Sequence, residues 1–598
     1  MTRYHQDAAS VADAIIGEVG REIVLGLPLG LGKANHIANA LYARAAADPS
    51  IKLTIFTALT LEKPKTSNEL ERRFMEPVIA RLFGDWPELA YARALRSGTM
   101  PANIEVNEFF FLAGSWLGVK RAQQSYISAN YTHAVRYLVE RGVNVVAQLV
   151  ARKGDCFSLS CNPDTILDLM KTGAKFLLAG EVNAELPFMP GDAELGEDAF
   201  AHVLDSPSTQ FSLFAPPREP IDLTEYAIGI HAARLVADGG TLQIGIGEEG
   251  DATVQALILR HKDNAAFREA VSRLTGGAPP LALEQHEPFA QGLYGVSEMF
   301  VDGFLELIDA GILTREVDGA LLHAAFFLGP KSFYRRLREM APERLAKLRM
   351  SAVSFTNELY GDQEAKTRAR VKGRFINSAM MATLLGALVS DGLEDGRVVS
   401  GVGGQHNFVT QAFALPDARS IIGVKSTRTA RGKTLSNIRY SYGQVTIPRH
   451  ERDIIVSEYG IADLRGKSDE NVIAAMLAIA DSRFQDELLR TAKDTGKIAK
   501  SYEIPTAFRD NTPERIARAL KPLDLPPFPF GTDFTPVEQR LLFALEKLKA
   551  AQPFALARLA LAGLSKSSDA EALARMGLDR PRSLPDRFYA ALVNGALG

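Results

Sequence analysis

The chain has 598 residues, of which 46% are hydrophobic and 23% are charged. At roughly 150 residues per domain, this length predicts about four compact units or three large ones, and the composition excludes a largely disordered, collagen-like or coiled-coil chain. The formal net charge of −3 gives no overall basic field for nucleic acid or an anionic membrane, so any anion site has to be local.

The cysteine content and the lengths of the apolar runs indicate the cellular compartment of the protein. Cys156 and Cys161 are the two cysteines of the sequence. They are too few for a disulfide framework, and they lack the further Cys or His ligands that a zinc site needs. The first residues lack the pattern of a signal peptide. The longest apolar runs, residues 109–119 and 379–389, stop short of the roughly 18 to 20 residues of a membrane span. We expect a cytoplasmic protein with no metal, no membrane segment and no nucleic-acid partner.

The first part of the chain alternates apolar β-rich runs with amphipathic helical stretches, which is typical of α/β units with parallel sheets. We expect strands at residues 23–27, 52–56, 143–150 and 175–178, and helices at residues 36–46 and 165–171. Serine, threonine and four prolines interrupt the pattern at residues 205–220, which favours a domain boundary there. The first domain is predicted to span residues 1–215.

The alternation restarts after this break. We expect a helix at residues 223–238, a strand at 241–246 and a helix at 251–261, in a second domain of residues 216–510. Prolines at 522–529 form a linker, and residues 535–538 have the spacing of a helix capping box. The predicted fold class is α/β, with two successive open α/β domains and a small C-terminal helical appendage, residues 511–598.

A glycine motif follows the strand expected at residues 241–246. Gly245, Gly247 and Gly250 match the G-x-G-x-x-G spacing of a dinucleotide-binding loop, so an NAD-dependent oxidoreductase is one alternative. Glu248 and Glu249 would repel a pyrophosphate, and an ordinary tight turn gives the same spacing. Either way, the glycines expose backbone N–H groups at a helix N-terminus, where they can stabilise an anion.

Residues 297–303 contain a carboxylate with apolar neighbours. Glu298 is flanked by residues such as Val296 and Met299, which suggests a partly dry site where lost hydration raises its pKa or makes it a better nucleophile. A solvated surface carboxylate is the ordinary alternative. Asp302 is expected to cap the helix that follows.

A second glycine cluster follows a β-like pair at residues 398–399. Gly401, Gly403 and Gly404 let a ligand approach the backbone closely, although a flexible turn has the same composition. His406 could be a general base, but a histidine between glutamine and asparagine is more often a hydrogen-bonded structural group.

The segment between Asp417 and Glu451 has seven cations and no acidic residue. Guanidinium and ammonium groups in such a window suit a ligand with several phosphates, and ordinary surface charge is the alternative. The seven cations are Arg419, Lys425, Arg428, Arg431, Lys433, Arg439 and Arg449.

Three of these features occur together in one known family. Residues 297–303, the cluster from Gly401 to Gln405, and residues 445–450 with 458–468 resemble the acetyl-CoA hydrolase/transferase family, a branch of the class I CoA-transferases. The last segment is the most family-specific. The resemblance is strong from about residue 223 to 511 and weaker at residues 180–183 and 186–192.

The resemblance implies that Glu298 attacks an acyl-CoA carbonyl and then forms a glutamyl-CoA thioester. It also implies that the backbone N–H of Ile246 and that of Gly403 or Gly404 serve as oxyanion-hole donors. We expect coenzyme A to contact residues around these turns and to place its phosphates on the cationic segment. The expected CoA-binding residues are Gly245, Gly247, Gly401, Gln405, Lys425, Arg428 and Lys433.

The predicted partners are an acyl-CoA and a carboxylate, with coenzyme A entering as part of the substrate, no separate cofactor, and a homodimer left open. The chain departs from the family pattern in three places. An insertion near residues 263–288 is expected to reshape the acyl pocket, Asn407 stands where many relatives have aspartate, and the helical tail lies outside the common fold. A non-catalytic CoA-binding protein remains a further alternative.

Overall fold

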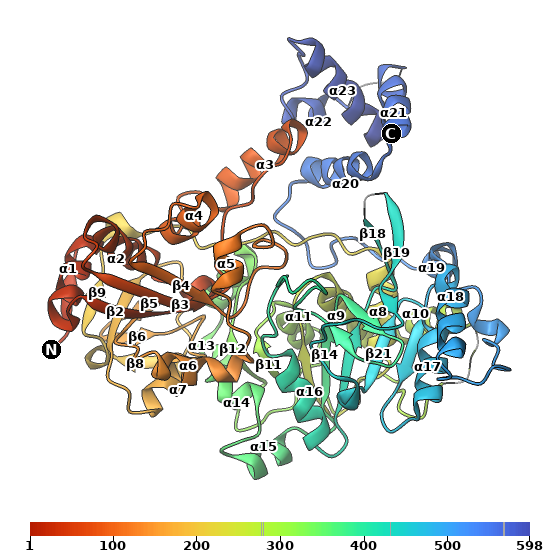
Figure 1. Ribbon diagram of the computed structural model, residues 1–598, viewed down its shortest axis with the longest axis horizontal. Helices are drawn as coiled ribbons and strands as arrows, with labels where there is room; N and C mark the ends of the chain where they lie inside the picture. Colours follow the sequence, from red (N-terminus) through yellow and green to blue (C-terminus); the bar gives the residue numbers. More distant parts are fainter. Residues whose placement is uncertain (277, 279, 431, 566–568) are drawn as a thin grey trace.

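The computed structural model describes residues 1–276, 278, 280–430, 432–565 and 569–598. Figure 1 shows two α/β layers side by side, with a group of C-terminal helices above them. The strands of the first sheet lie between residues 3 and 204, and those of the second between residues 241 and 463. The expected fold class is confirmed, while the domain boundaries at residues 215 and 510 stay a prediction.

The first sheet has seven strands along its main path, paired in parallel throughout. Their order is β1 (Arg3–His5), β9 (His202–Leu204), β7 (Leu177–Val182), β5 (Val145–Lys153), β2 (Glu22–Leu29), β3 (Lys52–Ala58) and β4 (Ile104–Glu108). The short strands β6 (Cys156–Ser158) and β8 (Glu194–Gly196) extend β5 in antiparallel fashion. The helices of this half are α1 (Ala8–Val19), α2 (Asn35–Ala47), α3 (Glu69–Leu82), α4 (Ala90–Ser97), α5 (Lys120–Gln124), α6 (Ala134–Glu140) and α7 (Ile166–Lys171).

The second sheet is parallel except at its last pair. Its order is β13 (Leu348–Met350), β12 (Leu322–Phe326), β11 (Tyr294–Met299), β10 (Thr241–Ile244), β14 (Arg374–Ser378), β17 (Arg419–Gly423), β21 (Ile454–Ser457) and β22 (Gly460–Asp463). Strands β15 (Met381–Thr383), β16 (Leu388–Val389) and β20 (Ile438–Arg439) form a small sheet, and β18 (Thr427–Ala430) with β19 (Lys433–Ser436) form a hairpin.

Helices cover the second sheet and complete the body of the molecule. They are α8 (Leu223–Ala233), α9 (Glu248–Lys262), α10 (Asn264–Thr275), α11 (Gly303–Asp309), α12 (Lys331–Glu339), α13 (Pro342–Leu345), α14 (Val353–Asn357), α15 (Gln363–Ala369), α16 (Gln405–Ala414), α17 (Asp469–Ala478), α18 (Ser482–Asp494) and α19 (Pro513–Leu520). Strands covered on both faces have to be apolar along their length, and β12 is buried at every position. One hydrophobic cluster contains residues of both halves, and the rings of Tyr131 and Phe326 meet across them with centroids 6.1 Å apart.

Most expected elements of the first half are found where the apolar runs placed them. The strands expected at residues 23–27 and 52–56 lie inside β2 and β3, and the helix expected at 36–46 is α2. The strand expected at 241–246 ends at Ile244, and α9 begins at Glu248 rather than at residue 251. The helix α9 begins early because Gly247, the residue before it, has a φ of 98°. This angle is readily accessible to glycine, so the turn after β10 can end there.

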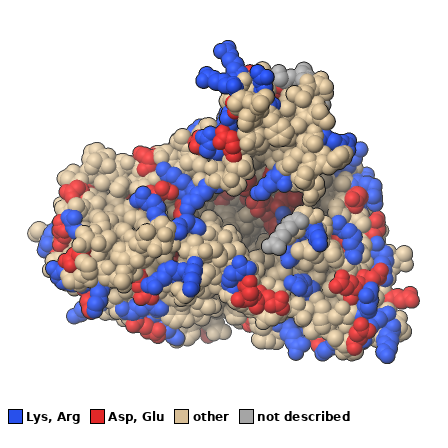
Figure 2. All heavy atoms as spheres, turned by 45° about the horizontal axis from the view of Figure 1, so that its top comes forward, with Lys and Arg blue, Asp and Glu red and all other residues tan. Residues whose placement is uncertain are grey.

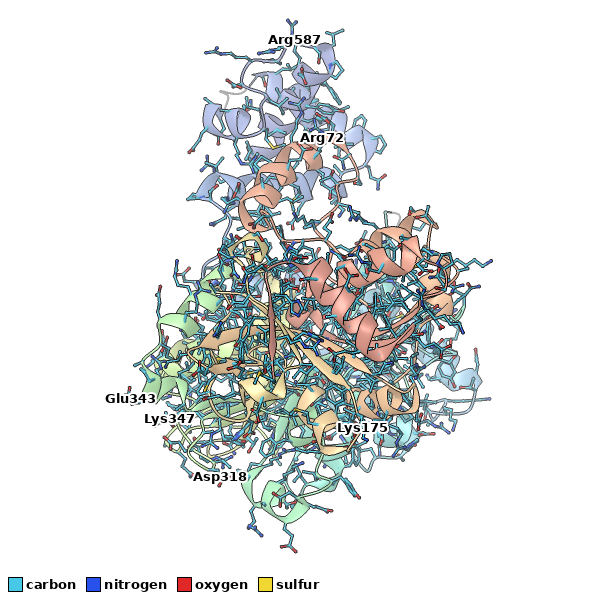
Figure 3. The ribbon with its side chains drawn as sticks, turned by 90° about the vertical axis from the view of Figure 1, so that its left-hand side faces the viewer. Arg72, Lys175, Asp318, Glu343, Lys347 and Arg587 are labelled. Carbon is cyan, nitrogen blue, oxygen red and sulfur yellow. The ribbon has the colours of Figure 1, made fainter. Side chains whose placement is uncertain are left out.

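The C-terminal residues fold into helices that stand on the first half. They are α20 (Pro536–Ala550), α21 (Pro553–Ser565), α22 (Ala570–Arg575) and α23 (Leu584–Leu597). The expected capping box is confirmed, because Thr535 and Glu538 exchange side-chain to backbone hydrogen bonds at the start of α20. Figure 3 shows α3, with Arg72 near its upper end, reaching the helices that carry Arg587.

Ion pairs and backbone contacts fix this junction. Arg73 of α3 pairs with Asp586 at 2.8 Å, and Arg81 pairs with Glu538 at 2.5 Å. Arg575 in turn donates to the backbone carbonyls of α3. The tail is therefore anchored to α3. Across the described residues, no helix combines the length and the apolar character that crossing a membrane would demand.

Candidate active site

The carboxyl ends of the two sheets meet at one cavity of about 270 Å³. Leu29, Leu59 and Phe110 reach it from the ends of β2, β3 and β4 in the first sheet. Residues at the ends of β10, β11, β12 and β14 reach it from the second sheet. Ligands of open parallel sheets bind at the carboxyl ends of strands, where the connecting loops diverge. The topology alone therefore makes this cavity the leading candidate for a ligand site.

Glu298 is the charged side chain of this cavity. It is the fifth residue of β11, and its Oε2 accepts a hydrogen bond from the Asn357 side chain at 2.5 Å. Burial raises the pKa of Glu298 to about 7, against the opposing effect of the Asn357 bond, and the nearby Asp164 raises it further. A carboxylate held away from water and given a single donor is a more reactive nucleophile than a solvated one.

Gly404 packs directly against the Glu298 carboxyl group. A Cβ atom at Gly404 would overlap Oε2 of Glu298 and the amide nitrogen of Asn357. Gly404 has φ −98° and ψ 2°, a conformation open to other residues, so the close approach, and not the backbone angle, requires glycine here. Contact with the Glu298 carboxyl group is thus the physical reason for a glycine at this position of the second glycine cluster.

The N-terminus of α16 points its unpaired amides at the same place. Gly404 is the residue before α16, and within the described chain its N–H has no hydrogen-bond acceptor. Gly403 is instead tied to Asn130 by an isolated parallel bridge, and its carbonyl accepts from Tyr131 at 2.9 Å. The partial positive charge of a helix N-terminus favours an anion. Gly404 is therefore better placed than Gly403 to stabilise a developing oxyanion.

The turn at Gly245–Gly247 supplies a second free amide. Gly245 donates its N–H to the carbonyl of Ile376 at 2.8 Å, which completes the sheet. Ile246 is 57% exposed, lines the cavity, and has an N–H that bonds to no other described residue. The structure thus brings Ile246, Gly404 and Glu298 to one cavity from three separate segments. Two amides and one carboxylate around a common space are the components of nucleophilic acyl transfer.

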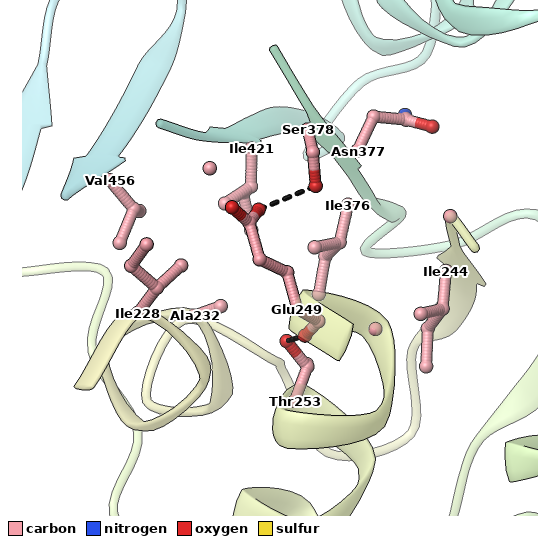
Figure 4. Close-up of a pocket in the computed structure, with 13 residues that line it drawn as sticks. Ile228, Ala232, Ile244, Glu249, Thr253, Ile376, Asn377, Ser378, Ile421 and Val456 are labelled. Atoms are coloured by element: carbon pink, nitrogen blue, oxygen red, sulfur yellow. Dashed lines mark hydrogen bonds between the residues drawn. The ribbon is translucent and has the colours of Figure 1, made fainter. Parts of the chain in front are cut away.

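A buried carboxyl group links the two turns. Figure 4 shows Glu249 in the first turn of α9 with Ser378 donating its hydroxyl to the Glu249 carboxyl group at 2.5 Å. The carbonyl of Ser378 accepts from the Gln405 side chain at 2.9 Å. Burial raises the pKa of Glu249 to about 7, and the nearby Lys425 opposes that shift. The chain Glu249–Ser378–Gln405 connects the start of α9 to the start of α16 and so fixes the spacing of their N-termini.

The dinucleotide alternative finds little support at this turn. The first turn of α9 carries Glu248, Glu249 and Asp251. Burial raises the pKa of Asp251 to about 7, with the carboxylate of Asp302 adding to the shift. A pyrophosphate at this N-terminus would meet three acidic side chains. The turn is therefore suited to a transient oxyanion reached from the cavity side, and not to a bound pyrophosphate.

The predicted phosphate-binding cations lie outside the cavity of Glu298. Lys425, Arg428 and Thr427 line a separate cavity of about 410 Å³ beside the β18–β19 hairpin, and Lys433 lies exposed on β19. Lys425 is paired with Glu225 at 2.5 Å. Arg431 lies outside the described residues. Phosphate binding by these side chains stays a prediction. The Glu225 carboxylate would compete with a phosphate for Lys425.

Acids from outside the segment 417–451 offset part of its positive charge. Arg419 pairs with Asp453 at 2.6 Å and also with Asp463, and these acids come from the β21–β22 region that follows in the chain. Figure 2 likewise shows Lys and Arg interspersed with Asp and Glu over the viewed face, where the surface is hollowed beneath the C-terminal helices. The segment is less basic in space than in sequence.

Two other residues of the second glycine cluster are structural. His406 forms an ion pair with Glu451 at 2.9 Å and does not line the cavity. Asn407 is buried and donates to the Thr132 hydroxyl at 3.1 Å. Gly247 likewise lies outside the cavity lining, where it serves as the start of α9.

Two expectations are wrong. Asp302 precedes α11 but makes no capping hydrogen bond, because Arg218, 84 positions away in the chain, holds its carboxylate in an ion pair. The described part of residues 263–288 contains α10, which packs beside α8, α9 and α19, and none of its described residues lines the cavity of Glu298. The described part of the insertion therefore lies on the outer helices, away from the cavity of Glu298.

Several residues of the site could not be identified from the sequence. Asn357, Ser378 and Phe110 belong to none of the motifs, yet each contacts the cavity or Glu298 itself. Each comes from a different segment and reaches the site through the packing of the two sheets.

The sequence model of one protein family, the acetyl-CoA hydrolase/transferase C-terminal domain, matches residues 329–492. The chain is 27% identical over 327 residues to a 4-hydroxybutyrate coenzyme A transferase of Clostridium kluyveri, covering 54% of this chain and 65%, just under two thirds, of that protein. It is 24% identical to a succinyl-CoA:cyclohexane-1-carboxylate CoA transferase of Geobacter metallireducens, covering 66% of this chain and 82% of that one.

Solved structures share the fold. RipA from Yersinia pestis superposes with a TM-score of 0.59 at 20% identity, covering 83% of this chain and 98% of that chain. A 4-hydroxybutyrate CoA-transferase from Porphyromonas gingivalis superposes with a TM-score of 0.55 at 20% identity, covering 82% and 98%. At these identities the likeness shows the shared arrangement of two sheets.

Proposed function

We propose that this chain moves coenzyme A from an acyl-CoA to a carboxylate through a thioester on Glu298, because the model of the acetyl-CoA hydrolase/transferase C-terminal domain matches residues 329–492 and the chain is similar to two CoA transferases at 24–27% identity. The observation that carries this proposal is the single cavity shared by the Glu298 carboxyl group, the Ile246 amide and the Gly404 amide. A carboxylate between two free amides at the junction of two sheets has no evident structural task.

The proposed reaction begins when a Glu298 oxygen attacks the thioester carbonyl of the acyl-CoA. The carbon–sulfur bond breaks, the CoA thiolate leaves, and a glutamyl–acyl anhydride remains. The thiolate then attacks the glutamyl carbonyl, which releases the acyl group as a free carboxylate and forms glutamyl-CoA. An acceptor carboxylate reverses these steps, yields the new acyl-CoA and restores Glu298. Every bond made or broken involves Glu298 or the substrates.

The two amides are proposed to stabilise the negative oxygen of each tetrahedral intermediate. A donor fixed before the reaction needs no reorganisation, and one such donor contributes about 10²- to 10³-fold in kcat. The elevated pKa of Glu298, about 7, reflects the incomplete solvation that makes the carboxylate reactive. Binding of the remote parts of coenzyme A supplies the energy to position and desolvate it.

We propose that Lys425, Arg428 and Lys433 receive the phosphates of coenzyme A. The support is their shared position at the β18–β19 hairpin and its adjoining cavity of about 410 Å³. Phosphate binding there requires Lys425 to exchange its Glu225 partner for a phosphate oxygen, which is a charge-assisted bond of comparable kind.

Replacing Asn357 with alanine should move the acidic limb of the kcat/KM profile to higher pH by roughly one unit. The nucleophile has to be ionised, and the lost amide donor stabilises that ionised form, so its removal raises the pKa of Glu298 above its present value of about 7. The loss of rate is expected to be about tenfold at pH 6 and small at pH 9. Profiles of wild type and Asn357→Ala between pH 5.5 and 9.5 measure this. Equal loss at all pH values would contradict the role.

The choice between transfer and hydrolysis is tested by the dependence on an acceptor. A transferase should accumulate glutamyl-CoA and release free CoA only slowly, because water is a poor competitor for the thioester, and an added carboxylate should take the CoA as a new acyl-CoA. Thiol release and new acyl-CoA are measured with and without butyrate or acetate. CoA release at an unchanged rate, with no new acyl-CoA formed, would reject transfer and support hydrolysis.

A further inference from the structure

Six of the apolar side chains that line the Glu298 cavity come from neighbouring strands of the two sheets, and we name them the apolar wall. Three of its residues follow neighbouring strands of the first sheet, and three belong to the ends of neighbouring strands of the second. Strand order therefore makes the wall continuous across the junction of the sheets. The apolar wall consists of Leu29, Leu59, Phe110, Met299, Phe326 and Leu328.

No cationic side chain of the described residues lines this cavity. Among the described residues that line the cavity, Glu298 is the one charged side chain. The side-chain amides of Gln243 and Asn377, which also line the cavity, bond to each other through two reciprocal hydrogen bonds of 3.2 and 3.0 Å. A ligand carboxylate placed against the wall would thus lose its hydration without gaining a charged partner, which is strongly unfavourable.

A buried cation, Lys33, lies next to Leu59 of the apolar wall but cannot reach a ligand in the cavity. Lys33 is buried, and its Nζ donates to the carbonyls of Ala58 and Leu59 at 2.6 and 3.2 Å. These bonds hold Leu59 at φ 46°, an uncommon angle for leucine, and so fix its side chain at the cavity. Lys33 does not line the cavity, so it shapes the wall without offering charge to a ligand.

The cavity also has more room than an acetyl group needs. Its volume of about 270 Å³ is far above the ~10–15 Å³ that holds one water molecule. Each methylene group placed against apolar side chains improves binding by about fourfold. A longer aliphatic acyl chain would therefore bind more tightly against the apolar wall, whereas a charged acyl chain of equal length would bind more weakly.

Resting on the proposed function, we infer that the acyl group accepted beside Glu298 is an uncharged aliphatic chain longer than acetyl, and that dicarboxylic acyl groups are rejected. Leu59 and Leu328, one from each sheet, are the residues assigned to this preference. The inference concerns the acyl half of the substrate and is separate from the chemistry at Glu298.

The first test compares acetyl-, butyryl-, hexanoyl- and succinyl-CoA as donors with one common carboxylate acceptor. In a ping-pong reaction, kcat/KM for the donor reports the first half-reaction alone. Butyryl-CoA should exceed acetyl-CoA by about fifteen-fold, from two methylene groups, and succinyl-CoA by at least about 100-fold. Values within threefold of one another, or a preference for succinyl-CoA, would overturn the inference while glutamyl-CoA formation kept the proposed function intact.

The second test places a cation in the wall. Leu328→Arg should raise the ratio of kcat/KM for succinyl-CoA to that for butyryl-CoA by at least about tenfold, since the new guanidinium pairs with the succinyl carboxylate. Leu328→Gln is the control of similar size without charge, and a thermal melt checks folding of both. An arginine variant whose ratio matches that of the glutamine variant would contradict the assignment of Leu328.

Leu59→Ala keeps the inference testable if Leu328→Arg does not fold. Shortening Leu59 should favour hexanoyl-CoA over butyryl-CoA by several-fold relative to wild type, because the wall retreats by three carbon atoms. Equal loss for all four donors would mean that the wall holds the pantetheine arm common to them, and would overturn the inference. If no donor forms a CoA adduct on the wild-type enzyme, the proposed function fails as well.

Discussion

Glu298→Gln should lower kcat for acyl-CoA conversion by at least about 10⁴-fold while leaving the Kd for free CoA within about threefold of wild type. The glutamine amide has nearly the shape of the carboxyl group and can still face Asn357 through its carbonyl oxygen. It cannot act as the anionic nucleophile, and removal of a nucleophile costs several orders of magnitude because the covalent route is lost altogether.

Steady-state kinetics and calorimetry with free CoA separate the two quantities. Asp302→Asn is a matched control, since it neutralises another acid four residues away that pairs with Arg218 outside the cavity lining. It should retain kcat within several-fold of wild type. Wild-type turnover by Glu298→Gln would show that the carboxylate is not the nucleophile, and the proposed function would fall with it.

Gly404→Ala should lower kcat by about 10²- to 10³-fold with a small change in Tm. The added methyl group would occupy the position of the Glu298 carboxyl oxygen and the Asn357 amide, so either the carboxylate or the start of α16 has to move. Both movements spoil the geometry between nucleophile and oxyanion donor, and a misplaced donor costs as much as a missing one. The backbone angles of Gly404 suit alanine, so the loss cannot come from strain.

Gly118→Ala provides the comparison, because a Cβ atom there meets no atom within 4 Å. That variant should keep the kcat and Tm of wild type. The pair is measured by steady-state kinetics and thermal melts under identical conditions. If Gly404→Ala turned over at the wild-type rate, the Glu298 carboxyl group would have to react from a position other than the one beside α16.

Periodicity in the sequence predicted the parallel sheets well, because buried parallel strands such as β2 are apolar over most of their length. The glycine turns could also be predicted, since Gly247 requires a left-handed backbone angle and Gly404 a close approach. Both constraints are local, because each one selects glycine at its own position in the sequence. The family resemblance added the proposed bond between Glu298 and coenzyme A, whereas its apolar neighbours indicated only a partly dry carboxylate.

Partners brought from distant segments could not be predicted. Asn357 donates to Glu298 from 59 positions away, and Arg218 takes the Asp302 side chain from the expected helix cap. Glu225 reaches Lys425 across 200 positions and offsets a charge that the sequence window left unopposed. In each case the residue type is common in proteins, and the pairing of the two residues arises only from the way the fold brings their segments together.

The most direct test of the account is the identity of the atom that becomes bonded to coenzyme A. Wild-type enzyme is incubated with butyryl-CoA without an acceptor, quenched in acid, digested with pepsin and analysed by peptide mass. The account predicts a peptide covering β11 (Tyr294–Met299) that carries CoA as a thioester on Glu298 and loses it on addition of hydroxylamine. Steady turnover with an unmodified β11 peptide, or CoA bonded to another residue, would contradict it.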